Sequence, residues 1–268
     1  MPVVKNVIAA LPEPETIDVE ALARSLLDGS TELVCVLGPT ASGKTKYAVT
    51  LAGELSELTG RGAEIISADS RQVYRGMDIG SGKDLGDYGG VPYHLIDIAE
   101  PGDGYNVFRF REDFNAAFED IRRRGCIPIL CGGTGLYINA VTSGYDFRQS
   151  KPLSAPSETG GNAPRTFFIG TLVSREVRNE RIDARLDARL REGMVDEIKG
   201  LLARGVPASV LLSYGLEYKY VTLYLQGELD YGSMRTRLAI AIHQFAKRQM
   251  TWFRGMERSG IRIHWVCP

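Results

Sequence analysis

The strongest constraint on the fold is a glycine-containing loop between an apolar run and a helical pattern. The apolar run covers 33–37, the helical pattern covers 46–55, and the loop between them reads Gly38-Pro39-Thr40-Ala41-Ser42-Gly43-Lys44-Thr45. This order is typical of a phosphate-binding loop, whose backbone N–H groups point inward at the start of a helix. In such a loop Lys44 reaches the outer phosphates and the Thr45 hydroxyl can ligate Mg²⁺. The loop alone leaves open whether a diphosphate or a triphosphate is bound.

The composition is that of a soluble globular protein, with 44% hydrophobic and 24% charged residues in a chain of 268. No apolar run approaches the ~20 residues of a membrane-spanning helix. Acidic residues soon follow the N-terminus, which is atypical of a signal peptide. Cys35 and Cys131 fall in expected buried strands, and the four cysteines lack metal-ligand spacing, which favours reduced thiols. We therefore expect a cytoplasmic protein without a membrane segment.

Short apolar runs alternate with helical patterns along the chain. Continuous apolar runs of this length are typical of parallel strands that are buried on both faces. We expect strands at 33–37, 63–68, 93–98, 127–131, 167–172 and 261–266, and helices at 19–27, 44–58, 107–124, 175–202, 209–226 and 233–254. Asn106 is expected to cap the third of these helices. The alternation predicts an α/β fold, a P-loop NTPase-like parallel sheet with helices on both faces and a helical C-terminal part.

The expected domain organisation is simple. Residues 1–30 form an N-terminal extension, and residues 31–268 form a single P-loop α/β domain. Within that domain, 149–164 is rich in Ser, Pro and Gly, which indicates a linker that is too short to be a domain.

Polar residues follow two other expected strands. Asp69 and Ser70 come directly after 63–68, and the second glycine loop, 132–135, comes after 127–131. The carboxyl ends of parallel strands are where open α/β sheets place their ligands. We therefore expect the two glycine loops and Asp69 to converge on one crevice.

The net charge of −1 does not by itself indicate a nucleic-acid-binding protein. Between 247 and 262, however, five basic residues accompany one acidic residue, and Trp252 and Phe253 lie among them. Such a run is either a solvated helix face or a surface that contacts a phosphate backbone. Trp252 fits an anchor in the core as well as a contact to RNA.

The three histidines, His94, His243 and His264, have no metal-ligand spacing. For His94 a structural hydrogen bond is the simpler interpretation. For Asp78 and Asp97, structural roles in loops are favoured over assistance to a bound Mg²⁺.

Five blocks of this sequence resemble the tRNA dimethylallyltransferase family. They lie in family order and are spread along the chain from 38 to 254. The blocks are the loop 38–45, Ile65 to Gly80 (IISADSRQVYRGMDIG), Gly90 to Asp97 (GVPYHLID), Pro128 to Ile138 (PILCGGTGLYI) and Ala246 to Arg254 (AKRQMTWFR).

The resemblance implies transfer of a dimethylallyl group from its diphosphate to N6 of adenosine 37, in the anticodon stem-loop of tRNA, with Mg²⁺. It places Asp69 at the general-base position, Lys44 and Thr45 at the diphosphate and Mg²⁺, and Arg181 as a further cation. A carboxylate suits this chemistry because the adenine N6 amine is a poor nucleophile that must lose a proton. Cations and loop N–H groups suit a diphosphate leaving group, which gains charge as it departs. The adenosine and tRNA contacts implied are Asp69, Ser70, Arg71, Gln72, Thr134, Lys247, Arg248, Gln249 and Trp252, and a monomer is expected.

The sequence departs from the family pattern at two places. Many members carry a helical insertion of several dozen residues where this chain has only 149–164. Where the family often reads Ile-Gly-Tyr-Lys/Arg-Glu, this chain reads Tyr214-Gly215-Leu216-Glu217-Tyr218. A free adenine nucleotide is therefore an alternative acceptor, as in the related adenylate isopentenyltransferases. A nucleotide or small-molecule kinase and a non-catalytic RNA-binding protein are further alternatives.

Overall fold

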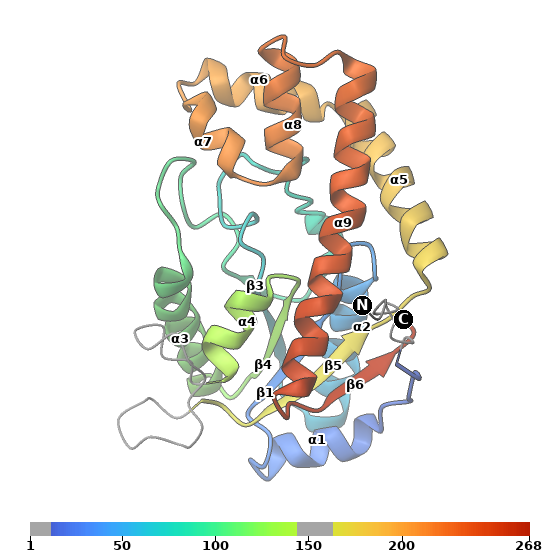
Figure 1. Ribbon diagram of the computed structural model, residues 1–268. Helices are drawn as coiled ribbons and strands as arrows, with labels where there is room; N and C mark the ends of the chain where they lie inside the picture. Colours follow the sequence, from blue (N-terminus) through green and yellow to red (C-terminus); the bar gives the residue numbers. More distant parts are fainter. Residues whose placement is uncertain (1–11, 144–162) are drawn as a thin grey trace, which may run out of the picture.

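A computed structural model describes residues 12–143 and 163–268 (Figure 1). The six strands in these residues form one parallel sheet in the order β3-β2-β4-β1-β5-β6. They are β1 Leu33–Leu37, β2 Ala63–Ser67, β3 Tyr93–His94, β4 Ile127–Gly132, β5 Thr166–Thr171 and β6 Ile263–Val266. The predicted α/β class and parallel sheet are confirmed.

The helices occupy most of the predicted segments. They are α1 Val19–Leu27, α2 Lys44–Thr59, α3 Val107–Arg123, α4 Gly135–Thr142, α5 Arg175–Glu192, α6 Met194–Ala203, α7 Ala208–Ser213, α8 Leu216–Leu225 and α9 Tyr231–Arg258, with a short 3₁₀ helix at Leu85–Tyr88. Asn106 caps α3 as predicted, since its side chain accepts hydrogen bonds from the N–H groups of Phe108 and Arg109.

Three predicted elements have different lengths in the structure. The strand expected at 93–98 ends at His94, because Leu95 and Asp97 have φ values of 62° and 57°, outside the extended region. The helix expected at 175–202 is broken at Gly193, where φ is 105°. The helix expected at 209–226 is broken before Leu216, because Gly215 has a φ of 117°. A backbone with positive φ cannot continue a right-handed helix or a strand.

Both faces of the sheet are covered, as predicted. Val34 and Val36 of β1 belong to the core that α1 and α2 form on one face. Leu33, Cys35 and Leu37 alternate with them and belong to the larger core on the other face, to which α3, α4 and α9 contribute. Cys35 and Cys131 are buried free thiols, as expected.

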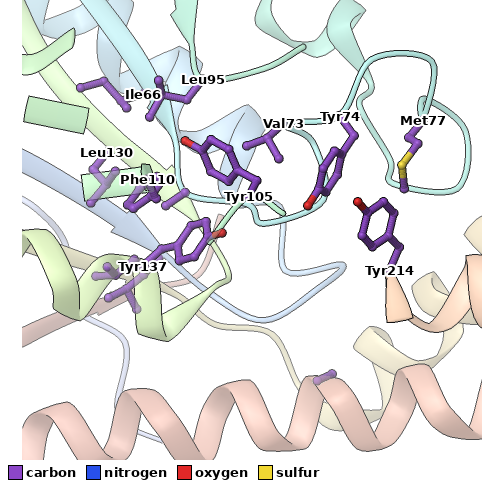
Figure 2. Close-up of a cluster of buried hydrophobic side chains, with 14 of the residues drawn as sticks. Ile66, Val73, Tyr74, Met77, Leu95, Tyr105, Phe110, Leu130, Tyr137 and Tyr214 are labelled. Atoms are coloured by element: carbon purple, nitrogen blue, oxygen red, sulfur yellow. The ribbon is translucent and has the colours of Figure 1, made fainter. Parts of the chain in front are cut away.

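The helical C-terminal part lies beyond the carboxyl edge of the sheet. In Figure 1, α6, α7 and α8 lie together above the sheet, and α9 runs from them down along it. An aromatic stack joins this part to the loops at the sheet edge, because the rings of Tyr74 and Tyr214 lie 4.4 Å apart (Figure 2). The N–H of Gly102 also donates to the Tyr214 hydroxyl over 2.7 Å. The two parts therefore pack directly against each other at the edge where the glycine loops end.

The structure describes only part of the predicted N-terminal extension and of the predicted linker. Within the predicted N-terminal extension, α1 buries Leu22, Ala23 and Leu26, so this part of the extension belongs to the packed core. Residues 149–162 of the predicted linker lie outside the described residues.

Candidate active site

The loop after β1 has the backbone of an anion-binding turn. Ala41 and Gly43 have φ values of 61° and 85°, and α2 begins immediately afterwards at Lys44. The N-terminus of α2 has no side-chain cap, which leaves its first N–H groups available to an anion. A Cβ at Gly38 would lie 2.2 Å from the Thr171 hydroxyl, so only glycine fits there. The Ser42 and Thr171 hydroxyls share a hydrogen bond of 2.6 Å, which fixes the loop against β5.

Gln249 of α9 joins the two glycine loops. Its side-chain oxygen accepts a hydrogen bond of 2.9 Å from the N–H of Thr40, and its amide nitrogen donates over 2.9 Å to the carbonyl of Gly133. The side chain is only 8% exposed. The structure shows this amide as a bridge between the two loops. Gln249 also lines a cavity of about 550 Å³, and its predicted contact to RNA stays a prediction.

Asp69 and the two glycine loops line one cavity of about 550 Å³, which confirms that they converge. One carboxylate oxygen of Asp69 accepts from the N–H of Arg71 over 2.9 Å. The Thr134 hydroxyl accepts from the N–H of Ser70 over 3.1 Å, so the second loop and the turn after β2 are tied together. These bonds hold the Asp69 carboxylate at the wall of the cavity to which Lys44 also contributes.

Gln72 fixes the segment that follows this turn. Its side-chain oxygen accepts from the Ser67 hydroxyl over 3.0 Å, and its amide donates over 3.1 Å to the carbonyl of Gly82. Gln72 also borders the large cavity and a smaller one of about 270 Å³. Gln72 therefore helps to fix the shape of both cavities through its hydrogen bonds to Ser67 and Gly82.

The smaller cavity brings Arg181 to the phosphate-binding loop. Lys44, Thr45, Arg181 and Arg185 all line it. Arg185 also lines the large cavity, together with Arg189. Residues four apart share one face of a helix, so these three arginines form a row along α5.

Arg185 and Arg189 were not predicted from the sequence. Their spacing from Arg181 was the available signal. Both contact the Asp84 carboxylate, Arg189 over 3.4 Å, so one acidic residue partly balances two cations.

Burial changes the protonation behaviour of two cavity residues. Desolvation lowers the pKa of Lys44. The Asp69 carboxylate opposes this effect, and the guanidinium groups of Arg185 and Arg189 add to it more weakly. An anion bound at the loop would favour the charged ammonium and oppose this effect. Desolvation also raises the pKa of Glu217, which faces Arg189 and Asp69 in the large cavity.

The wall formed by α9 is aromatic and basic. Phe245, Arg248 and Trp252 line the large cavity, and Trp252 lies against Gly135 at the start of α4. Trp252 is 42% exposed, so it both packs on α4 and presents a ring surface. The sequence did not single out Phe245, whose ring lies under the Arg248 guanidinium. Lys247 is exposed on α9 and does not line either of these cavities.

Several other candidate residues have structural partners. His94 contacts the Glu64 carboxylate over 2.7 Å. Asp78 and Asp97 both pair with Lys83, which is 4% exposed, and Asp78 does so over 2.7 Å. These contacts agree with the structural roles that the sequence favoured.

Within 12–143 and 163–268, no group of three or more His, Cys, Asp and Glu side chains is arranged to hold a metal ion. None of the helices in those residues is both long and apolar enough to span a bilayer.

Comparison with known proteins identifies the relatives of this chain. A family model described as IPP transferase matches residues 72–160 and 147–256. The tRNA dimethylallyltransferase 1 of Parabacteroides distasonis is 47% identical over 290 residues, which covers 88% of this chain and 92% of the relative. The tRNA dimethylallyltransferase 1 of Porphyromonas gingivalis is 48% identical over 87% of this chain and 93% of its own.

The Parabacteroides alignment and the family-model match both agree with the predicted absence of an insertion. The alignment of 290 positions is longer than the 268 residues of this chain, so the Parabacteroides protein has residues that this chain lacks. The two segments matched by the family model meet at 147–160, where the sequence predicts that absence.

Solved structures with this fold are also known. The full-length tRNA isopentenylpyrophosphate transferase of Bacillus halodurans superposes with a TM-score of 0.75 at 31% identity, over 88% of this chain and 89% of that chain. The extent of these matches establishes that the chain belongs to the IPP transferase family, together with proteins named tRNA dimethylallyltransferase.

Proposed function

We propose that this protein transfers a dimethylallyl group from dimethylallyl diphosphate to N6 of adenosine 37 in tRNA. The observation that carries the proposal is that a carboxylate, Asp69, and the phosphate-binding residues Lys44 and Thr45 line one cavity. The names of the curated relatives support tRNA as the acceptor.

In the proposed reaction the adenine N6 attacks C1 of the dimethylallyl group. The new C–N bond forms as the C–O bond to the diphosphate breaks, and the bonding electrons leave with the diphosphate. Asp69 accepts the proton that N6 loses. The bond from the N–H of Arg71 holds one Asp69 oxygen, which leaves the other oxygen for the proton.

The diphosphate is proposed to bind at the smaller cavity, between the α2 N-terminus and the α5 arginines. Four positive side chains and two acidic ones line this space, namely Lys44, Lys46, Arg181 and Arg185 with Asp84 and Asp87, so its lining carries a net positive charge. Preorganised cations stabilise a leaving group most when its charge increases during the reaction. This arrangement therefore favours bond breaking and not only donor binding.

Mg²⁺ fits the proposed donor site because its preferred ligands are oxygens, often from one or two protein groups together with substrate phosphates and water. Among the described residues, the Thr45 hydroxyl is the group that we expect to hold it, beside the diphosphate oxygens. The ion would supply charge neutralisation at the leaving group.

The acceptor base is proposed to enter the large cavity. A base in a stacked loop must be extruded before an enzyme can modify it. The aromatic and basic wall formed by Phe245, Arg248 and Trp252 suits nucleobases and phosphates at the cavity mouth. Exposed Lys247 can meet the backbone outside it. We expect the protein to act as a monomer in the cytoplasm.

The decisive experiment compares acceptors under identical conditions. The protein is incubated with dimethylallyl diphosphate and Mg²⁺, and with unmodified tRNA or with AMP, ADP or ATP. N6-modified adenosine in the tRNA digest is the expected product. Product on the free nucleotides but not on tRNA would instead establish the second candidate function, an adenylate isopentenyltransferase. That alternative is favoured by the residues that the Parabacteroides protein has and this chain lacks. Phosphoryl transfer from ATP without any prenyl product would indicate a kinase.

Substitution of Asp69 separates an enzyme from an RNA-binding protein. Asp69→Asn keeps the shape and one acceptor oxygen but cannot take a proton, so turnover should fall by about 10²- to 10⁴-fold. The affinity for tRNA, measured by filter binding, should change by less than about threefold, since the contact surface is intact. Unchanged turnover in Asp69→Asn and Asp69→Ala would exclude Asp69 as the base.

A further inference from the structure

One short segment borders both cavities. Gly80, Ser81 and Gly82 line the large cavity, and Gly82 and Asp84 line the smaller one. We call residues 80–82 the dividing wall. A displacement of this segment would change the shape of the large cavity along its whole length and that of the smaller cavity at Gly82.

The backbone that leads into this wall is bound by one carboxylate from another part of the chain. Glu197 of α6 accepts three hydrogen bonds from successive backbone N–H groups. These come from Asp78 over 2.8 Å, from Ile79 over 2.7 Å and from Gly80 over 3.0 Å. Glu197 does not itself line either of the two cavities.

The same carboxylate also fixes a side chain of the large cavity. The Tyr218 hydroxyl donates to Glu197 over 3.0 Å, and Tyr218 is 1% exposed. The ring lies directly on Gly80, since a Cβ there would be 2.8 Å from the ring. Glu197 therefore connects α6, α8 and the dividing wall through four hydrogen bonds.

We propose that Glu197 is a positioning residue for the transfer reaction, which holds the dividing wall at the distance that the two substrates require. This inference rests on the proposed function. A carboxylate is needed because it offers two acceptor oxygens, and each oxygen here receives two of the four bonds. A glutamine has one acceptor oxygen, and its amide group would face donors.

The fold does not depend on Glu197 alone, which makes the proposal testable. Lys83, which directly follows the dividing wall, binds the Tyr74 carbonyl, Asp78 and Asp97. Gln72 holds the carbonyl of Gly82 over 3.1 Å. With these contacts intact, loss of the Glu197 contacts should displace residues 78–80 without detaching the whole loop.

The experiment compares Glu197→Gln with Asp196→Asn. Asp196 is the neighbouring exposed acid in the first turn of α6, so both variants remove one negative charge from the same helix end. With tRNA and donor both saturating, kcat of Glu197→Gln should fall by about tenfold or more, because misplaced substrates react slowly. The KM for tRNA should stay within about threefold, and Asp196→Asn should match the parent within about twofold.

Hydrogen exchange provides a second readout that needs no turnover. The amides of 78–80 should exchange faster in Glu197→Gln than in the parent or in Asp196→Asn, while the amides of β1 and β4 keep their protection. Unchanged exchange at 78–80, or a kcat that falls only in proportion to the unfolded fraction, would overturn the proposal. If the parent itself transfers nothing, the proposed function fails, and exchange at 78–80 still decides whether Glu197 holds the wall.

Discussion

At the scale of single residues, Gln249 shows how a side chain can organise a site through its bonds to the protein itself. It bonds to Thr40 in one glycine loop and to Gly133 in the other, and it is buried. Gln249→Ala would remove the partners of the part-buried Thr40 N–H and of the buried Gly133 carbonyl. Loss of these two hydrogen bonds should lower the free energy of unfolding by about 1–3 kcal/mol. Because the bonds join the two glycine loops of the site, kcat/KM should also fall.

Urea unfolding and turnover measured on the same preparation check this prediction. Gln244→Ala is the matched control, because Gln244 is an exposed residue on the same helix. Equal stability of the two variants would mean that the bridge contributes nothing.

At the scale of elements, the break between α5 and α6 separates two roles: α5 carries the row of arginines that line the cavities, and α6 carries Glu197, which binds the backbone of residues 78–80. Gly193 makes this break with a φ of 105°, and a Cβ there would meet no atom within 4 Å. Gly193→Ala therefore tests backbone conformation alone, and it should destabilise the protein by about 1–2 kcal/mol.

Gly53 offers the opposite case. It lies inside α2, also with open space around a Cβ, so Gly53→Ala should stabilise the protein by about 0.5–1 kcal/mol. Thermal unfolding of both variants tests these predictions, since the Tm should fall in Gly193→Ala and rise in Gly53→Ala. A stabilising effect of both alanines would show that φ at 193 is not what sets the helix break.

Sequence reasoning predicted what is local in the chain. The apolar runs predicted the strands, and the phosphate-binding loop and Asp69 were found because each directly follows a strand. The helix breaks were missed because a glycine within a helical pattern does not reveal its φ. Glu197 left no signal at all, because three of its four hydrogen bonds come from backbone N–H groups more than a hundred residues away.

At the scale of the whole molecule, the end of the sheet opposite the site is held by a buried carboxylate that pairs with a half-exposed guanidinium. Glu64 of β2 is 5% exposed and bonds to Arg124, just after α3, over 2.8 Å, and to His94 of β3 over 2.7 Å. One carboxylate thus joins two strands and a helix. The Arg124 guanidinium, with help from His94, lowers the pKa of Glu64 from 4.5 to about 2.

This pKa makes a definite part of the stability depend on pH. A carboxylate whose pKa is lower in the folded state stabilises the protein above pH 4.5, and that contribution is lost as the pH falls toward 2. For a fully shielded pair this difference corresponds to roughly 3 kcal/mol, and solvent around the 42%-exposed Arg124 side chain reduces it to about 1–2 kcal/mol. Glu64→Gln should therefore be less stable than the parent at neutral pH by an amount of this order, and the gap should narrow steadily between pH 4.5 and 2. Urea unfolding across this pH range measures the gap.

Glu57→Gln, which changes an exposed residue of α2, serves as the control and should give a stability curve parallel to that of the parent. A constant gap for Glu64→Gln would show that packing of the side chain, and not its charge, holds the sheet to α3.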